Sequence, residues 1–211
     1  MNFIDDSIEN YCRDMSSPPA DYLNELDRET HLKVLSPNML SGYLQGRVLS
    51  MLSKLVRPST AVEIGTYTGY SALCLAEGLA EGGKIHTIEV NDELEPMIRK
   101  YLEKSPYHNA VQLHIGDAAK IIPSIEAPFD IVFIDAGKKD YPDFFDLVID
   151  KMNPGGIILA DNVLWSGKVL DENRDEETQA LVDFNHKVLD NPEVEVVILP
   201  VRDGISVIRK K

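Results

Sequence analysis

The order of apolar segments after Pro58 is the feature that most constrains the fold of this chain. Segments rich in Ile, Val and Leu follow one another at residues 61–64, 85–90, 111–115, 131–134, 157–160, 194–199 and 205–208. The first five are separated by stretches long enough for crossover helices, which is typical of a parallel α/β sheet. The last two are joined only by residues 200–204, too few for a parallel crossover. We therefore expect five parallel strands followed by an antiparallel hairpin.

The first 56 residues differ from the rest because their apolar residues have helical spacing. We expect helices within residues 2–15, 20–35 and 40–55, with Pro37 interrupting the pattern between the last two. The chain is accordingly divided into an N-terminal helical extension, residues 1–56, and an α/β domain, residues 57–211. Its 211 residues suit one domain with such an extension.

Composition excludes several classes of protein. The formal net charge of −14 disfavours general binding to a nucleic-acid backbone. The chain contains two cysteines, without C-x-x-C spacing, so thiolate zinc sites and a disulfide framework are excluded, and Cys74 is expected in the core. No apolar run approaches the roughly 18 residues of a membrane span, and the acidic start does not resemble a signal peptide. We expect a cytoplasmic protein without membrane contact.

Ligands of open α/β sheets bind beyond the carboxyl ends of the strands, so the residues at these ends are of most interest. The first strand leads into Glu63-Ile64-Gly65-Thr66-Tyr67-Thr68-Gly69, where two glycines allow a tight turn close to a ligand. Tyr67 departs from the G-x-G-x-x-G pattern of dinucleotide sites. Glu89 ends the second strand, where a carboxylate can accept both hydroxyls of a ribose. Asp117 follows the third strand and either binds an adenine amino group or only caps the next helix. Together these residues describe a nucleoside pocket, although the glycines alone could simply make a strand-to-helix turn.

Oxygen-bearing side chains follow the next two strands. Asp135 ends the fourth segment, and Asp161 and Asn162 end the fifth. Two carboxylates and an amide suit a hard divalent cation, Mg²⁺ first, with Mn²⁺ or Ca²⁺ as alternatives. The other interpretation is that the aspartates cap helices and the asparagine turns a loop. We favour the metal, because two carboxylates placed together need a cation between them.

These motifs resemble those of the cation-dependent O-methyltransferases, the relatives of caffeoyl-coenzyme A and catechol O-methyltransferases. The resemblance rests on E-I-G-T at 63–66 with G-Y-S at 69–71, F-I-D-A-x-K at 133–138 with Tyr141, D-N-V-L-W-S-G at 161–167, and L-P-V-R-D-G-I at 199–205. It implies a Rossmann-like class I methyltransferase fold, with sheet order 3-2-1-4-5-7-6, an antiparallel last strand and helices on both faces. It also implies S-adenosylmethionine (SAM) as cofactor, held by Glu63, Gly65, Thr66, Gly69, Ser71, Glu89, Asp117, Ala118, Asp135 and Tyr141. The implied metal ligands are Asp135, Asp161 and Asn162.

The resemblance further implies that Lys138 is the general base. A cation that binds two adjacent oxygens of a phenol would stabilise the phenolate, and a nearby lysine could take its proton. Lys138 could instead be a solvated loop lysine like its neighbour Lys139. Trp165 could stack on an aromatic acceptor or merely pack its loop. The chain departs from the family at Gly137, where plant relatives carry an acidic residue and the animal catechol enzyme a bulky aromatic, which opens the wall beside Lys138.

We expect methyl transfer to a hydroxyl of a small, catechol-like aromatic molecule. An alternative is methylation of a hydroxylated uridine in transfer RNA, for which Arg47, Lys54, Arg57 and residues 209–211 could supply a local basic face. A third possibility is a module that binds the cofactor without catalysis. By resemblance we also expect a homodimer, with the N-terminal extension contributing to substrate or dimer contacts.

Overall fold

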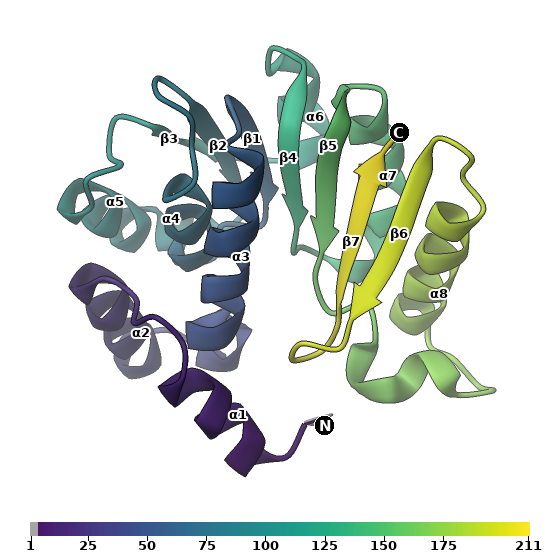
Figure 1. The fold of residues 1–211 in the computed structure, drawn as a ribbon, viewed down its shortest axis with the longest axis horizontal. Helices are drawn as coiled ribbons and strands as arrows, with labels where there is room; N and C mark the ends of the chain where they lie inside the picture. The colour runs from purple at the N-terminus through teal and green to yellow at the C-terminus, as the bar shows by residue number, and fades with distance from the viewer. Residues whose placement is uncertain (1–3) are drawn as a thin grey trace.

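A computed structural model describes residues 4–211 of the chain. Its centre is one seven-stranded sheet of order β3-β2-β1-β4-β5-β7-β6 (Figure 1). The strands are β1 (Thr60–Ile64), β2 (Lys84–Glu89), β3 (Val111–Ile115), β4 (Phe129–Ile134), β5 (Met152–Ala160), β6 (Val194–Leu199) and β7 (Ile205–Lys210). β1 to β5 run parallel, and β7 lies antiparallel between β5 and β6. The predicted strand order and hairpin are confirmed.

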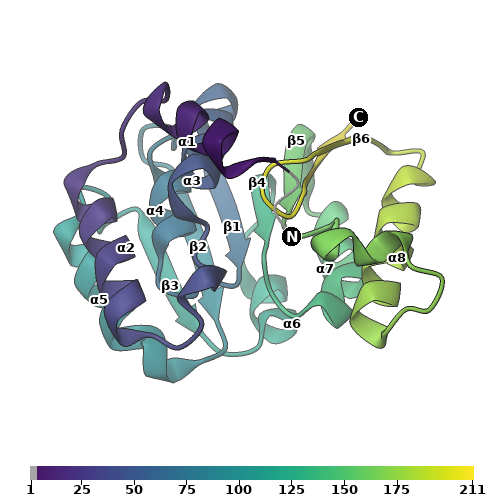
Figure 2. The same cartoon turned by 90° about the horizontal axis from the view of Figure 1, so that it is seen from below.

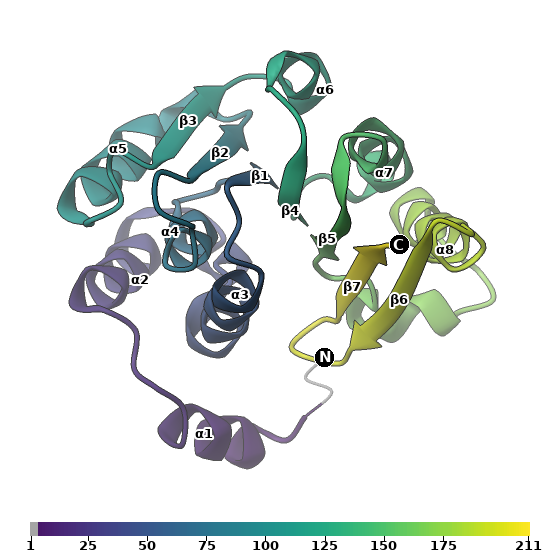
Figure 3. The same ribbon diagram turned by 45° about the horizontal axis from the view of Figure 1, so that its top comes forward.

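Helices cover both faces of the sheet. They are α1 (Asp6–Asp14), α2 (Asp21–Lys33), α3 (Gly42–Val56), α4 (Tyr70–Ala76), α5 (Glu95–Lys104), α6 (Ala118–Ile121), α7 (Tyr141–Ile149) and α8 (Glu176–Leu189), with short 3-10 turns including η1 (Pro37–Met39), η4 (Lys138–Asp140) and η5 (Trp165–Leu170). Figure 3 shows α3, α4 and α5 on one face, with α2 outside them, and α6, α7 and α8 on the other. The helical character predicted for residues up to 56 is confirmed, except for residues 2 and 3, which lie outside the described part.

Two apolar cores lie on the two faces of the sheet. One packs Val132, Ile134 and Ile158 against α7 and α8, and the other packs Ile131, Phe133 and Leu159 against α2 to α5. Successive residues of β4 thus point alternately into the two cores, as expected of a parallel strand buried on both sides. Cys74 is fully buried in the second core, as predicted.

The N-terminal extension contacts the domain unevenly. α2 buries Leu23 and Leu26, whereas α1 has no buried residue and lies away from the sheet beside α3 (Figure 2). No helix in the described chain has the length and apolar character needed to span a bilayer.

Candidate active site

The carboxyl ends of β1, β2, β4 and β5 are held together by hydrogen bonds that continue past the strands. The amides of Gly65 and Thr66 donate to the carbonyl of Ile88, at 3.0 and 3.2 Å. Asp135 donates through its amide to Ile64 at 2.9 Å, and Asp161 donates to Ile134 at 3.0 Å. The residues predicted from four separate segments therefore lie along one edge of the sheet.

Gly65 allows the loop after β1 to lie against the loop after β4. Its φ is +97°, and a Cβ built on it would lie 1.9 Å from the carbonyl oxygen of Asp135. No residue with a side chain fits there without moving the backbone. Gly69, with φ +96°, ends this loop directly before α4.

Glu63 is a fully buried carboxylate in this region. Its Oε2 accepts a hydrogen bond from Thr87, whose hydroxyl also pairs with that of Thr66, while Oε1 has no hydrogen-bond partner among the described residues. Burial raises the pKa of Glu63 to about 8, although the hydroxyls of Ser71 and Thr87 lower it. An unsatisfied buried acceptor is costly, so this oxygen fits a ligand that supplies a hydrogen-bond donor.

Glu89 and Asp117 occupy the ends of the next two strands. Oε2 of Glu89 accepts from the amide of Tyr67 at 2.7 Å, and Oε1 accepts from the amide of Asn91 at 2.9 Å. Each carboxylate oxygen has a second lone pair that remains for a ligand hydroxyl. Asp117 caps α6, since its Oδ1 accepts from the amide of Ala119 at 2.9 Å. The capping role is thus real, and a contact with adenine stays a prediction.

The N-terminal extension contacts the loop between Gly65 and Gly69. The buried hydroxyl of Thr30 donates to that of Thr68 at 3.1 Å. The hydroxyl of Tyr67 donates to the carbonyl oxygens of Leu35 and Ser36, at 3.1 and 3.2 Å. Residues 30–36 therefore support the candidate cofactor loop from outside.

Lys138 is buried beside Asp135, unlike its exposed neighbour Lys139. Its Nζ donates to Oδ1 of Asp135 at 3.1 Å and to the hydroxyl of Tyr141 at 2.7 Å. Only 8% of the Lys138 side chain is exposed, whereas Lys139 is exposed and pairs with Glu176. The interpretation of Lys138 as a solvated loop residue is therefore wrong, because its amino group is buried and bonded to Asp135 and Tyr141.

Asp161 and Asn162 follow β5 at the same edge. Asp161 is buried, with Oδ2 accepting from Nε2 of Gln45 at 2.6 Å and Oδ1 accepting from the amide of Asn162 at 2.8 Å. Burial raises the pKa of Asp161, and the nearby negative charge of Asp135 raises it further. Within residues 4–211 no three His, Cys, Asp or Glu side chains gather at one point, so a metal here would depend on two carboxylates and the Asn162 amide.

Trp165 faces this group from the loop after β5. Nζ of Lys138 lies 5.8 Å from the centre of its ring, and its buried Nε1 has no hydrogen-bond partner in the described chain. The hairpin between β6 and β7 holds this loop, because the amide of Ser166 donates to Oδ1 of Asp203 at 2.5 Å. Trp165 also packs against the core beneath it, so both roles considered for it agree with its position.

Three contacts within the candidate site are not predicted by the sequence. Gln45 contacts Asp161, Thr87 contacts Glu63, and Arg202 contacts Gln45. The sequence shows a glutamine within the amphipathic helical pattern of residues 40–55, and an arginine within the L-P-V-R-D-G-I motif. Neither signal identifies the partner.

Comparisons with known proteins show the family and the fold. The family model described as O-methyltransferase matches residues 13–211. A catechol O-methyltransferase of Niastella koreensis is 32% identical over 94% of this chain and 91% of its own length. Caffeoyl-CoA O-methyltransferase 1 of Arabidopsis thaliana is 34% identical over 79% of this chain and 69% of its own.

Solved structures of O-methyltransferases have the same fold as this chain. An O-methyltransferase of Streptomyces achromogenes involved in tomaymycin synthesis, in complex with SAM, superposes with a TM-score of 0.90 at 26% identity, covering 97% of this chain and 96% of that one. An O-methyltransferase from Bacillus cereus, in complex with S-adenosylhomocysteine (SAH), gives a TM-score of 0.90 at 27% identity, covering 97% of both chains.

The fold and these likenesses define a Rossmann-like methyltransferase. More narrowly, the chain belongs to the O-methyltransferase family. The fold class, the family and the enzyme class expected from the sequence are confirmed.

Proposed function

We propose that this enzyme transfers the methyl group of SAM to a hydroxyl of a small catechol-like aromatic molecule, with the help of a divalent cation. The observation that carries the proposal is the burial of Lys138 between Asp135, Tyr141 and the Trp165 ring. The amino group of Lys138, the carboxylate of Asp135 and the ring of Trp165 lie at the edge that also carries the nucleoside-pocket residues, which supports a role in catalysis. The names of the relatives, catechol and caffeoyl-CoA O-methyltransferases, support a phenolic acceptor.

Residues at the ends of β1 to β3 would bind SAM. The free oxygen of Glu63 would accept a hydrogen bond from the ammonium of the methionine part, and Glu89 would accept from the ribose hydroxyls. Gly65, Thr66, Gly69 and Ser71 would line the turn, with Asp117 and Ala118 at the adenine. The SAM and SAH in the two solved relatives support this cofactor. In the structure Asp135 and Tyr141 contact Lys138, and a direct cofactor contact stays a prediction for both.

Asp135, Asp161 and Asn162 have the chemistry of a site for Mg²⁺, or for Mn²⁺ or Ca²⁺. Each oxygen of Asp161 accepts one hydrogen bond and keeps a lone pair for a cation. Burial, and then the charge of Asp135, raise the pKa of Asp161. A bound cation would relieve the repulsion between the two carboxylates. When bound, the cation would act as a Lewis acid that stabilises a phenolate oxygen.

The protein's own residues would then orient and deprotonate the acceptor. Trp165 would pack on the aromatic ring. Nζ of Lys138, once it has released its own proton and is a neutral amine, would accept the proton of the reacting hydroxyl. When bound, SAM would supply the methyl group: the S–CH₃ bond would break as the O–CH₃ bond forms, and SAH would leave with the electron pair on sulfur. Orientation and electrostatics would supply most of the rate gain.

The basic residues named for a transfer RNA substrate do not favour that alternative. Arg47 and Lys54 both pair with Glu77, and Arg209 pairs with Glu195. Arg57 precedes β1 and residues 209–211 end β7, so they lie toward the amino-terminal ends of the parallel strands, opposite the candidate active site. RNA held there would not present a base to Lys138.

The proposal is tested by a methyl-transfer assay on a panel of catechols, with products identified by mass spectrometry. We expect turnover with SAM and Mg²⁺, loss of turnover with a chelator, and recovery when Mg²⁺ or Mn²⁺ is restored. Lys138→Met should lower kcat by about 100-fold or more, whereas Lys139→Met is the matched control and should keep it. Full turnover in chelator would contradict the metal role, and SAM binding without any methyl transfer would favour a non-catalytic module.

Homodimerisation and a cytoplasmic location remain predictions from the sequence. The same holds for the boundary at residue 56, although the contacts of residues 30–36 with Tyr67 and Thr68 support a role for the extension near the cofactor.

A further inference from the structure

Gln45 connects the N-terminal part of α3 to the carboxylate of Asp161. It is fully buried, and both polar atoms of its amide are used. Nε2 donates to Oδ2 of Asp161 at 2.6 Å, and Oε1 accepts from Nη1 of Arg202 at 3.1 Å. A guanidinium only donates and a carboxylate only accepts, so these two partners dictate which end of the amide faces which.

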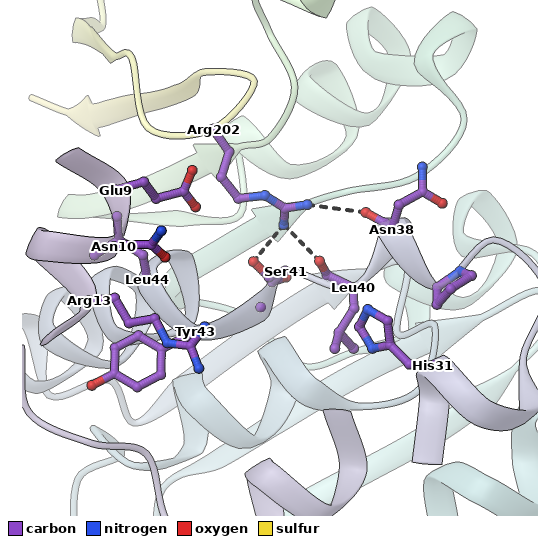
Figure 4. A pocket seen from close by; sticks show the side chains of 12 residues that line it. Glu9, Asn10, Arg13, His31, Asn38, Leu40, Ser41, Tyr43, Leu44 and Arg202 are labelled. Carbon is purple, nitrogen blue, oxygen red and sulfur yellow. Dashed lines mark hydrogen bonds between the residues drawn. The ribbon is translucent and has the colours of Figure 1, made fainter. Parts of the chain in front are cut away.

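Arg202 fixes the glutamine from the turn between β6 and β7. Its Nη1 also donates to the carbonyl oxygens of Leu40, at 2.7 Å, and Ser41, at 2.5 Å, and Nη2 donates to that of Asn38 at 3.1 Å (Figure 4). The guanidinium thereby ties the hairpin turn to the segment that leads into α3. It also lines a pocket of about 270 Å³ together with residues of α1, η1 and α3.

We propose that Gln45, held by Arg202, is a positioning residue that fixes the direction of the Asp161 carboxylate and thereby sets the affinity of the site for a divalent cation. This inference rests on the metal dependence proposed above. With Oδ1 bound by the amide of Asn162 and Oδ2 bound by Gln45, the carboxylate plane is defined at both oxygens. Hydrogen bonds to metal ligands from such neighbours commonly change metal affinity by about 10- to 100-fold.

The chemistry of glutamine suits this task. A neutral amide orients the Asp161 carboxylate without cancelling its charge, whereas a cationic side chain in direct contact, as Lys138 is with Asp135, partly neutralises a carboxylate. Arg202 does not contact Asp161 through a hydrogen bond, because the amide of Gln45 lies between the guanidinium and the carboxylate. The cation site is then linked to the docking of α3 against the β6–β7 turn.

The first test compares Gln45→Met with the wild-type protein in Mn²⁺ binding, followed by electron paramagnetic resonance, and in SAH binding, followed by calorimetry. Methionine keeps the length of the side chain and removes both hydrogen bonds. We expect the Kd for Mn²⁺ to rise about 10-fold while the Kd for SAH stays within about twofold. Gln179→Met is the matched control, because Gln179 makes the same amide-to-carboxylate contact with Asp183, at 2.7 Å, on the exposed face of α8. It should leave both affinities unchanged.

A second pair of variants tests the same inference at Arg202, in case Gln45→Met does not fold. Arg202→Met should weaken Mn²⁺ binding, and Arg202→Lys should restore part of it, because a lysine keeps one cationic donor. A purely structural role would instead lower SAH and Mn²⁺ affinity together, and a Gln45→Met protein that binds Mn²⁺ within twofold of wild type would overturn the inference. If the wild-type protein binds no Mn²⁺, the metal site itself fails, and this inference fails with it.

Discussion

Nζ of Lys138 donates a hydrogen bond to the hydroxyl of Tyr141 across 2.7 Å, and both side chains are buried. The same hydroxyl lies 3.0 Å from the carbonyl oxygen of Asp161 and 3.2 Å from that of Ile134, so its one proton is directed to the ends of β4 and β5. Burial and the negative charges of Asp135 and Asp161 raise the pKa of Tyr141 well above its usual value. Tyr141 therefore remains a protonated phenol that positions Lys138.

Replacement of this hydroxyl, Tyr141→Phe, should slow the reaction while keeping the fold. We expect kcat to fall about 10-fold because Lys138 loses a partner that fixes its ammonium, with a loss of stability of about 1–3 kcal/mol. Steady-state kinetics and urea denaturation measure the two effects. The control is Tyr101→Phe, which removes a hydroxyl bonded to Glu29 and to the carbonyl of Glu25, away from the site. Equal kcat losses in both variants would show that Tyr141 acts only through stability.

The contact between the loops after β1 and β4 leads to a prediction about stability. Gly65→Ala should destabilise the protein by about 3 kcal/mol or more, because positive φ and a clash with the Asp135 carbonyl add together. Gly82→Ala has positive φ as well, but its Cβ would have no neighbour within 4 Å. It should cost only about 1–2 kcal/mol. Urea midpoints of the two variants separate the clash from the backbone strain, and equal midpoints would argue against the close approach.

Much of the site could be predicted because its residues directly follow strands. Glu63, Asp135 and Asp161 lie at or just after the carboxyl ends of β1, β4 and β5, which a parallel sheet brings to one edge. The boundary of β5 was less accessible to prediction. The Asn-Pro-Gly-Gly sequence at residues 153–156 is typical of a turn. The strand nevertheless begins at Met152, which pairs with Phe129 before a shift in register.

Gln45 and Arg202 could not be assigned from the sequence for a different reason. Gln45 lies 116 residues from Asp161 and 157 residues from Arg202, and no local pattern encodes such distant contacts. They depend on how α3 docks against the β6–β7 turn. The same applies to Thr30, whose partner Thr68 lies 38 residues away in another element.

The buried carboxyl of Glu63 predicts a pH dependence of stability. Its pKa is about 8 in the folded protein and near 4.5 when exposed, so the folded state holds the proton more tightly. Between these values unfolding releases a proton. Stability should therefore fall as the pH rises from about 4.5 to about 8, by an amount on the order of 5 kcal/mol, and the loss is complete above that range.

Glu63→Gln tests this dependence, because the amide cannot ionise. Urea midpoints measured from pH 5 to pH 9, without SAM and with chelator, should show the wild type losing stability relative to the variant as the pH rises. A difference between the two proteins that stays constant over this range would refute the raised pKa.

Gly137 offers a test of the wall beside Lys138. Its φ of −57° is open to any residue, and an added Cβ would meet only the flexible carboxylate of Asp140, at 3.4 Å. Gly137→Tyr should therefore fold and bind SAH normally. If the open wall admits large acceptors, the variant's kcat/KM for catechols with a bulky second ring should fall about 10-fold relative to catechol itself. Lys139→Tyr adds the same ring to the neighbouring exposed position, where the native side chain pairs with Glu176, and should leave this ratio unchanged. An unchanged ratio in both variants would place the acceptor away from residue 137.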